Sequence, residues 1–295
     1  MQLEECPNWK TPKPTMGEGA VGEQILVPWT GSAMGLVDLG VIAGRSRPTV
    51  VTLLGAAKAG KTTILASWYM LIGRGLGPAT RQFAGSYTLD GWETLSSPLR
   101  WAPEDPPRFP AHTTSNADRT PGLLHLAFRS ADLRLRDVMF ADAPGEWFRR
   151  WAINENADGA EGARWLADQA DILLVVIDSE ALAGPGVGPA RGELQALAPR
   201  VAQHRLDRPV ALVWAKSDVE LDSEIELSVR RSMLRHLPDA QEFHVSVKPG
   251  KEGEPAPGVI ALLDWILDAA RPTSRLPVLH AADTQDSFLM LGRNI

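Results

Sequence analysis

One nine-residue stretch of the sequence has the composition and spacing of a phosphate-binding loop. The stretch is GAAKAGKTT, residues 55–63, and it fits the pattern G-x-x-x-x-G-K-[ST], between an apolar run and a helix-like stretch. Gly55 and Gly60 permit backbone angles and close approach that a Cβ would block, so that successive amides can point at phosphate oxygens. We therefore predict a nucleotide-binding loop. The alternative is a Gly-rich turn that carries Lys-Thr by chance.

Three side chains of this loop have expected tasks. Lys61 would neutralise the β- and γ-phosphates and so assist catalysis, and Thr62 would ligate Mg²⁺ through its hydroxyl. Lys58 would either touch phosphate or face solvent. The dipole of the helix that starts here adds positive potential. The loop residues expected to contact the nucleotide are Gly55, Ala56, Ala57, Lys58, Ala59, Gly60, Lys61, Thr62 and Thr63.

A second stretch, VMFADAPGEWF, supplies a carboxylate at the end of an apolar run. Nucleotide hydrolases need such a group to hold Mg²⁺, usually through water, and Asp142 has this place. With the phosphate loop upstream, the stretch resembles the translation-factor and Ras branch of the P-loop GTPases, whose D-x-x-G motif matches residues 142–145. The resemblance implies that the Gly145 amide contacts the γ-phosphate and moves when it is lost. Otherwise Asp142 would only cap a helix.

A third stretch, VALVWAKSDVE, matches the [NT]-K-x-D motif of the same family at Lys216 and Asp218. The resemblance implies that the Asp218 carboxylate accepts hydrogen bonds from guanine while the Lys216 stem packs over the ring. Ala215 departs from the family's Asn or Thr, which normally braces the phosphate loop, so the resemblance leaves that bracing open. The alternative is an exposed K-x-D sequence at a strand end.

The last family motif, S-A-K, is matched loosely by Ser246, Val247 and Lys248. The resemblance implies that a backbone amide of this stretch meets guanine O6. The lysine count supports the set, because the chain contains far more Arg than Lys and most of its seven lysines fall in these stretches. In such a chain, this concentration indicates ammonium groups placed for a purpose. The four lysines concerned are Lys58, Lys61, Lys216 and Lys248.

The residues that complete catalysis are expected around the γ-phosphate. Relatives use a Thr just before the second strand to complete the Mg²⁺ shell, and Thr120 has that position, with Thr113 and Thr114 as upstream alternatives. Glu146 follows the D-x-x-G glycine, where Ras-like proteins carry Gln. It would either orient the attacking water or cap the following helix, and its charge near a γ-phosphate is unfavourable unless a cation intervenes.

The elements that must position these residues alternate between short apolar runs and helical periods, which is typical of a parallel sheet with crossover helices. We predict an α/β fold, by resemblance the three-layer, Ras-like P-loop NTPase fold, with a mostly parallel six-stranded sheet flanked by helices. The predicted strands are 49–54, 123–128, 138–142, 171–178, 210–215 and 243–247. The predicted helices are 61–73, 147–169 with a Gly-rich interruption, 190–205, 221–236 and 257–270.

The chain divides into a central domain and two flanking segments. Residues 1–46 form an N-terminal extension, 47–272 the P-loop GTPase domain and 273–295 a C-terminal tail. Within the domain, residues 73–120 carry many Pro, Gly and Ser residues and form a long insert in the switch region.

Composition excludes several classes of function. The chain has 295 residues, 44% of them apolar, and a net charge of -6, so it can bury a core and has no global basic field for nucleic acid. Its single cysteine excludes an internal disulfide. The N-terminus is acidic and polar rather than a signal peptide, and the longest apolar run, 172–177, is too short to span a bilayer. We expect a cytoplasmic protein without direct membrane insertion.

Two further stretches of the sequence indicate one type within this family. RFPAHTT and PGLLHLAFR are similar to the bacterial double-GTPase type of the TRAFAC clade. This resemblance implies Mg²⁺-dependent hydrolysis of GTP to GDP and phosphate, and a switch read by a protein effector or operon-encoded partner through the switch regions. The alternatives are a nucleotide-binding scaffold with negligible hydrolysis and an ATPase of the same fold. Tryptophans near the expected switches would either pack inside or face the partner: Trp92, Trp101, Trp147, Trp151 and Trp165.

Overall fold

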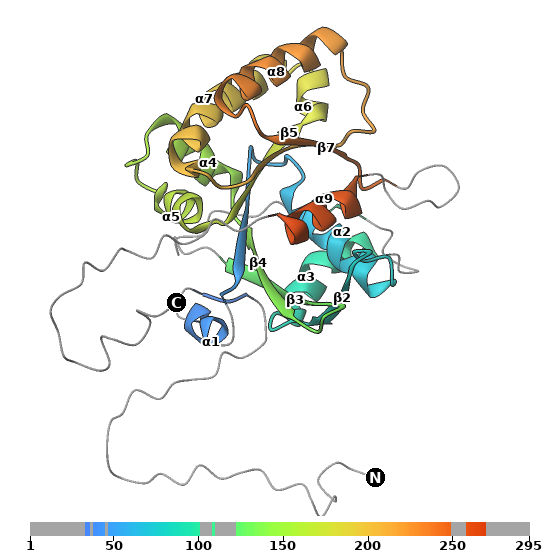
Figure 1. Cartoon of the computed structure of the whole chain (residues 1–295). Coiled ribbons are helices and arrows are strands. Elements are labelled where there is room, and N and C mark those ends of the chain that lie inside the picture. Colours follow the sequence, from blue (N-terminus) through green and yellow to red (C-terminus); the bar gives the residue numbers. More distant parts are fainter. Residues whose placement is uncertain are drawn as a thin grey trace, which may run out of the picture.

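A seven-stranded sheet forms the centre of the described part of the molecule (Figure 1). The computed structural model describes residues 33–35, 38–44, 47–100, 108–109, 122–248 and 258–269. The spatial order of the strands is β2-β3-β4-β1-β5-β6-β7. Their bounds are β1 Thr49–Leu54, β2 Arg81–Gly85, β3 Gly122–Ser130, β4 Leu135–Asp142, β5 Ile172–Asp178, β6 Val210–Ala215 and β7 Gln241–Val245.

The strands that carry the predicted motifs run parallel. β1 pairs in parallel with β4 on one side and β5 on the other, and β6 and β7 continue the parallel set. Every residue of β1 and β6 is buried, which explains their unbroken apolar runs, since helices cover both faces of a parallel sheet. The carboxyl ends of these strands therefore meet at one edge, where ligands bind in such sheets.

The prediction of six strands missed one. The additional strand, β2, lies at the edge of the sheet and pairs antiparallel with β3, which itself pairs antiparallel with β4. Its sequence, RQFAG, is short and its middle residues are exposed, so it lacks the hydrophobic alternation that predicts a strand. Part of the predicted insert 73–120 is thus a regular strand and helix of the domain.

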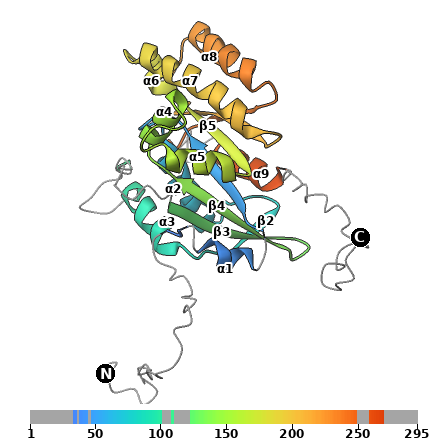
Figure 2. The same ribbon diagram turned by 90° about the vertical axis from the view of Figure 1, so that its left-hand side faces the viewer.

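Helices cover both faces of the sheet (Figures 1 and 2). α2, α3 and α9 pack on one face, while α4, α5, α7 and α8 pack on the other. The bounds are α1 Leu39–Ala43, α2 Lys61–Gly73, α3 Leu89–Ser96, α4 Gly145–Ile153, α5 Glu161–Gln169, α6 Ser179–Ala183, α7 Val187–Arg205, α8 Ser223–His236 and α9 Val259–Asp268, with a short 3-10 helix, η2, at Ser97–Leu99. This confirms the three-layer α/β prediction.

The Gly-rich interruption predicted within the helical region 147–169 separates two helices, α4 and α5. The chain turns between them at Gly159, whose φ is 79°. Of the predicted extension 1–46, the structure describes 33–35 and 38–44, which contain α1. The predicted tail 273–295 lies outside the described residues.

The helix that follows the phosphate loop is fixed by a buried tryptophan. Trp68 on α2 has no exposed surface, and its ring lies 5.2 Å from that of Phe140 on β4. Its indole N–H donates to the Val259 carbonyl at 2.7 Å, which ties α9 to the same helix. Trp68 therefore joins α2, the sheet and α9 in one hydrophobic cluster.

The described tryptophans near the expected switches pack inside the protein. Trp92, Trp147 and Trp151 are at most 4% exposed, and Trp165 is partly buried against the core. Trp101 lies outside the described residues. These four tryptophans therefore contribute to the packing of the protein interior.

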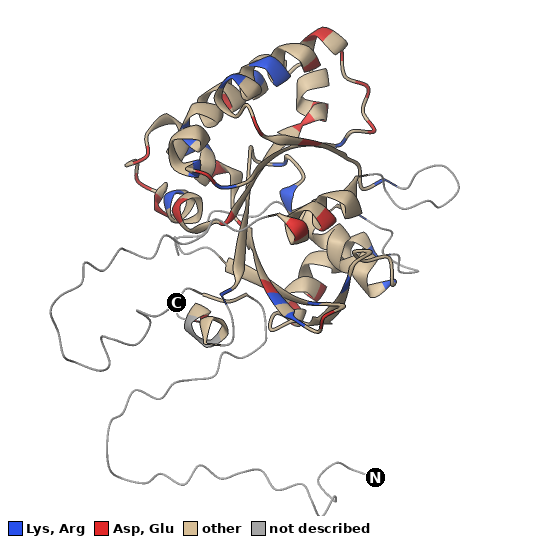
Figure 3. Ribbon diagram, viewed as in Figure 1, with Lys and Arg blue, Asp and Glu red and all other residues tan. Residues whose placement is uncertain are grey.

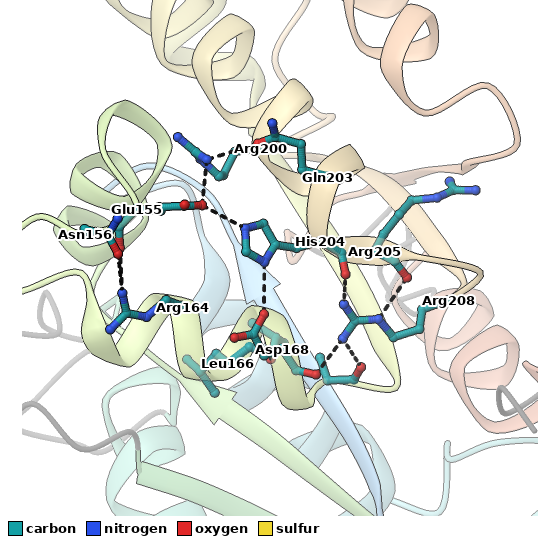
Figure 4. Close-up of polar contacts among 12 residues, drawn as sticks. Glu155, Asn156, Arg164, Leu166, Asp168, Arg200, Gln203, His204, Arg205 and Arg208 are labelled. Atoms are coloured by element: carbon teal, nitrogen blue, oxygen red, sulfur yellow. Dashed lines mark hydrogen bonds and ion pairs between the residues drawn. The ribbon is translucent and has the colours of Figure 1, made fainter. Parts of the chain in front are cut away.

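A polar network holds the far end of α4 (Figure 4). The ring of Trp151 on α4 stands edge-on to that of His204 on α7, with centroids 5.1 Å apart. His204 Nδ1 lies 2.9 Å from Asp168 Oδ1 and its Nε2 lies 3.3 Å from Glu155 Oε2. Arg200 also donates to Glu155, at 2.8 Å. These contacts connect α4, α5 and α7.

A buried histidine anchors the first part of the insert to the sheet. His125 on β3 is 1% exposed, and its Nδ1 accepts a hydrogen bond from the Tyr87 amide at 3.0 Å. The other ring nitrogen lies 3.0 Å from Asp137 Oδ1. Because Nδ1 is an acceptor, Nε2 carries the proton and donates to the Asp137 carboxylate. The Thr88 hydroxyl accepts from the His125 amide at 2.9 Å, so the turn before α3 is held to β3.

Charges on α8 follow the helix dipole (Figure 3). Glu224 and Glu226 lie in its first turn, and Arg235 and His236 in its last. Acidic groups near the N-terminus and basic groups near the C-terminus of a helix are each favourable. The side chain of Asp222 caps the same N-terminus by accepting from the amides of residues 224 and 225. This arrangement fixes the start of α8 directly after the K-x-D stretch.

Trp68→Ala should lower the free energy of unfolding by about 3–5 kcal/mol, the usual cost of removing a buried aromatic side chain. The reason is that the substitution removes the Phe140 contact and the hydrogen bond from the indole to the Val259 carbonyl. Urea denaturation followed by circular dichroism measures the change. As a control, Ile153→Ala at a side chain that is 71% exposed should change stability by less than about 0.5 kcal/mol. Equal effects at the two positions would contradict this account of the core.

Candidate nucleotide-binding site

The predicted phosphate loop joins the end of β1 to the start of α2. Its backbone alternates in handedness, with positive φ at Gly55 (154°), Lys58 (62°) and Gly60 (96°). Successive amides in such a backbone form a concave surface that suits an anion. A Cβ on Gly55 would lie 2.6 Å from the Val176 carbonyl oxygen, so β5 leaves room only for glycine. The local sequence and the neighbouring strand thus both require this curved loop.

Lys61 is enclosed by the loop that it follows. Its Nζ donates to the carbonyls of Gly55 at 3.0 Å and Ala56 at 2.7 Å, and the residue is 6% exposed. Burial lowers the pKa of Lys61 from 10.5 to about 8, an effect partly offset by the negative charges of Asp142 and Glu146. The loop therefore encloses an ammonium group whose burial is costly and is offset in part by two carbonyls and by nearby carboxylates.

The two predicted metal ligands contact each other. The Thr62 hydroxyl donates to Asp142 Oδ1 at 2.9 Å, because β1 and β4 are parallel neighbours and both motifs follow their carboxyl ends. Hydroxyl and carboxylate oxygens are hard ligands of the kind that Mg²⁺ prefers. Among the residues that the structure describes, no three His, Cys, Asp or Glu side chains gather as metal ligands. The hydroxyl and the carboxylate are thus two oxygen groups of the kind that hold Mg²⁺.

The D-x-x-G glycine lies directly against the phosphate loop. A Cβ on Gly145 would lie 2.2 Å from the Ala57 amide nitrogen, so only glycine allows this approach. Gly145 also begins α4, whose first turn contains Glu146. The negative charge of Glu146 is one of those that raise the pKa of Lys61 against the lowering effect of burial. Glu146 and Lys61 therefore belong to one electrostatic environment at the phosphate loop.

The K-x-D and S-x-K stretches meet at the carboxyl ends of β6 and β7. Asp218 Oδ1 accepts from the Ser246 hydroxyl at 2.9 Å, and Asp218 Oδ2 lies 2.6 Å from Lys248 Nζ. Burial raises the pKa of Asp218, but the hydrogen bonds from Lys248 and Ser246 outweigh this and leave the pKa below its ordinary value. Asp218 is thus an anion with its oxygens already in use as acceptors.

Lys216 faces the same region from an unusual backbone conformation. Its φ is 57°, and its Nζ donates to Asp178 Oδ2 at 2.9 Å and to Glu180 Oε2 at 2.8 Å. Burial lowers the pKa of Lys216, but the hydrogen bonds to these two carboxylates outweigh it and raise the pKa above its ordinary value. Lys216 is therefore held as a cation.

A cavity of about 340 Å³ connects the phosphate loop to this cluster. Its walls come from the loop and the start of α2, the start of α4, the first turn of α6 and the ends of β6 and β7. The lining residues that the sequence predicted are Lys58, Ala59, Gly60, Lys61, Thr62, Thr63, Gly145, Lys216, Asp218, Val247 and Lys248. One cavity thus joins the stretches expected to bind phosphate and those expected to bind base.

The comparison with family models agrees with this geometry. The model of the Double-GTPase 2 family matches residues 49–266, which include the loop and all three later motifs. The chain belongs to the Double-GTPase 2 family. A search among curated proteins finds no similar protein. No helix within the described ranges is long and apolar enough to cross a membrane.

Several predicted residues of this Double-GTPase 2 protein lie beside the cavity rather than on its wall. Gly55, Ala56 and Ala57 border a second cavity of about 490 Å³ between the loop, α4, α6 and α7. Asp142 and Ser246 reach the site through Thr62 and Asp218, to which they are hydrogen-bonded. Lys58, for which the sequence left two possibilities, is exposed and on the cavity wall. Thr113, Thr114 and Thr120 lie outside the described residues.

The structure also adds residues that sequence reasoning missed. Phe109, from the predicted insert, lines the cavity with 61% of its surface exposed. Glu180 lines it from the first turn of α6, just after β5 ends at Asp178. The position after a buried parallel strand was the available signal, because carboxyl ends of such strands meet at the ligand edge. No spacing in the sequence pointed to Phe109.

The buried charge of Lys61 should make stability depend on pH. Because the pKa is about 8 in the folded chain and 10.5 when exposed, the unfolded chain binds more protons between these values. The free energy of unfolding should therefore rise with pH across this window. Between pH 7 and pH 10.5, the free energy of unfolding of the wild type should rise by up to roughly 3 kcal/mol more than that of Lys61→Met. Urea denaturation at several pH values measures this.

The matched control is Lys58→Met, which changes an exposed lysine of the same loop. It shows the effect of losing an exposed ammonium group of the loop. A difference between Lys61→Met and the wild type that does not change with pH would contradict the burial of the Lys61 charge.

Proposed function

We propose that this chain binds GTP together with Mg²⁺ and hydrolyses it to GDP and phosphate. The observation that carries the proposal is the single cavity lined by both the Gly60–Thr63 turn and the Lys216–Asp218 stretch. The Gly60–Thr63 stretch offers amides and an ammonium group to phosphates. The Lys216–Asp218 stretch offers a carboxylate to a base that carries two neighbouring hydrogen-bond donors. Membership of the Double-GTPase 2 family supports GTP as the nucleotide.

The base would lie against Lys216 and Asp218. Guanine presents an N1–H and an exocyclic amine on one edge, and a carboxylate with two oxygens can accept both, whereas adenine lacks this pair of donors. In the structure Lys248 and Ser246 occupy these oxygens, and Lys248 is exposed enough to move aside, with 62% of its side chain accessible. Guanine would therefore replace contacts that hold Asp218 in its charged form.

Thr62 and Asp142 would hold Mg²⁺ at the phosphate end. Their oxygens lie 2.9 Å apart, and both are hard ligands. When bound, Mg²⁺ supplies positive charge to the β- and γ-phosphate oxygens. Thr120 stays the proposed third ligand from the switch region.

Lys61, Gly145 and Glu146 would act at the γ-phosphate. Lys61 would offset charge that develops on phosphate oxygens, a contribution that is large in a site shielded from water. Gly145 packs against the loop, and its amide would contact a γ-phosphate bound there. Glu146 would orient the water, with Lys61 reducing the repulsion between its carboxylate and the phosphate.

We further propose that GTP sets the conformation around Gly145 and that a protein partner, such as one encoded in the same operon, reads that surface. The contact between Gly145 and the phosphate loop supports this, because a phosphate bound on the loop has to affect the start of α4. Arg149 and Arg150 on α4 are exposed and available to such a partner. Without it, we expect slow hydrolysis.

Asp218→Ala should weaken GTP binding by roughly 10-fold or more, since two hydrogen bonds to a charged group are lost. It should also abolish the preference for GTP over ATP. Titration calorimetry with both nucleotides measures the two effects. Asp239→Asn, an exposed carboxylate paired with Arg205, is the control and should bind like the wild type. An unchanged GTP preference in Asp218→Ala would remove the assignment of base recognition.

Asp142→Asn should reduce steady-state phosphate release by roughly 10- to 100-fold, because a metal-held charge is worth several kcal/mol in the transition state. The amide oxygen can still accept from Thr62, so the fold should be kept. Phosphate release with Mg²⁺ and with a chelator gives the measurement. GTP binding by the wild type without Mg²⁺-dependent release would instead favour the nucleotide-binding scaffold.

A further inference from the structure

The side chain of Lys216 is held by two carboxylates that no sequence motif marks. Its Nζ lies 2.9 Å from Asp178 Oδ2 and 2.8 Å from Glu180 Oε2. The ammonium group is thus fixed on the side of α6, and Lys216 is one of the residues that line the cavity. A lysine side chain has many rotamers, so fixing both hydrogen bonds removes freedom that nucleotide binding would otherwise have to remove.

Asp178 has two separate tasks at the end of β5. Its Oδ1 accepts from the amides of Glu180 and Ala181 and so caps α6. Its Oδ2 accepts from Lys216, and the side chain is only 10% exposed. Because Asp178 stands opposite Ala215 in the parallel register of β5 and β6, the carboxylate is level with the start of the K-x-D stretch.

Glu180 acts from a more open position. Its side chain is 67% exposed, and it lines the nucleotide cavity, which Asp178 does not. The hydrogen bond from Lys216 holds the pKa of Glu180 below its ordinary value. An exposed ion pair contributes less than a buried one, so Asp178 should carry the larger share.

The neighbouring backbone shows why Lys216 needs such support. Its φ of 57° is a conformation that residues with a Cβ adopt at a cost, and it persists where surrounding contacts over-determine it. Ala215, the preceding residue, has no polar group and contributes only its methyl near Gly60. The carboxylates on α6 and β5 are therefore the groups that fix the Lys216 side chain.

We propose that Asp178 and Glu180 are positioning residues for the nucleotide, which hold the Lys216 side chain on the cavity wall where the base binds. This inference rests on the proposed function. It assigns no contact between Asp178 and the nucleotide, since the carboxylate acts through Lys216. Loss of the two carboxylates should weaken nucleotide binding and leave the chemical step intact.

Asp178→Asn with Glu180→Gln tests the proposal. Asn caps a helix about as well as Asp, so α6 should keep its N-terminus while the anionic acceptors of Lys216 are lost. We expect GTP to bind about 10-fold more weakly, with kcat at saturating GTP within about 2-fold of the wild type. Glu180→Gln alone should cost about 2- to 3-fold, because the pair is exposed.

A double-mutant cycle with Lys216→Met tests whether the two carboxylates affect GTP affinity through Lys216. If the carboxylates act through Lys216, the Asp178→Asn and Glu180→Gln changes should have little further effect on GTP affinity once Lys216 is Met. The matched control is Asp222→Asn, because Asp222 caps α8 through its Oδ1 as Asp178 caps α6 and makes no contact with Lys216. It should bind GTP like the wild type.

The outcomes separate this inference from the proposed function. Wild type that binds no GTP would overturn the proposed function. Wild-type binding combined with unchanged affinity in the double variant, or an equal loss in the Lys216→Met background, would overturn the positioning role. If Asp178→Asn does not fold, the positioning role is tested with Glu180→Gln and its double-mutant cycle with Lys216→Met. This change is at a solvent-exposed side chain and leaves the fold intact.

Discussion

The ammonium group of Lys61 lies inside the loop that joins β1 to α2, and the surrounding elements are arranged to keep it there. Two loop carbonyls accept its hydrogen bonds, and the carboxylates of Asp142 and Glu146 offset part of the cost of its burial. The same curvature that turns those carbonyls toward Lys61 is of the kind that lets loop amides face an anion. A buried ammonium group inside such a loop, at the start of a helix, suits a phosphate.

The backbones of β5 and α4 pack directly against the phosphate loop. β5 approaches so closely that Gly55 has no room for a side chain, and α4 begins so closely that Gly145 has none either. The other end of α4 is fixed by Trp151 against His204 and its carboxylate partners. α4 is therefore held at both ends, at its start by the phosphate loop and at its end by residues of α5 and α7.

The parallel sheet explains why residues so far apart in sequence share one cavity. Each parallel strand ends at the same edge, and each is followed directly by a group of the site. Helices on both faces bury the strands and leave that edge as the place where polar groups are exposed to a ligand. The groups are the loop after β1, Asp142 at the end of β4, Asp178 at the end of β5, Lys216 and Asp218 after β6, and Ser246 and Lys248 after β7.

The sequence by itself determined the parallel strands, the helix from Lys61 to Gly73 and the motifs of the site, because hydrophobic runs and fixed spacings are local properties of the chain. It did not show β2, since an exposed edge strand needs no apolar alternation. It also did not show that Asp178 and Glu180 bind Lys216. Only the tertiary structure decided that, because the register of β5 against β6 brings together side chains 36 to 38 residues apart.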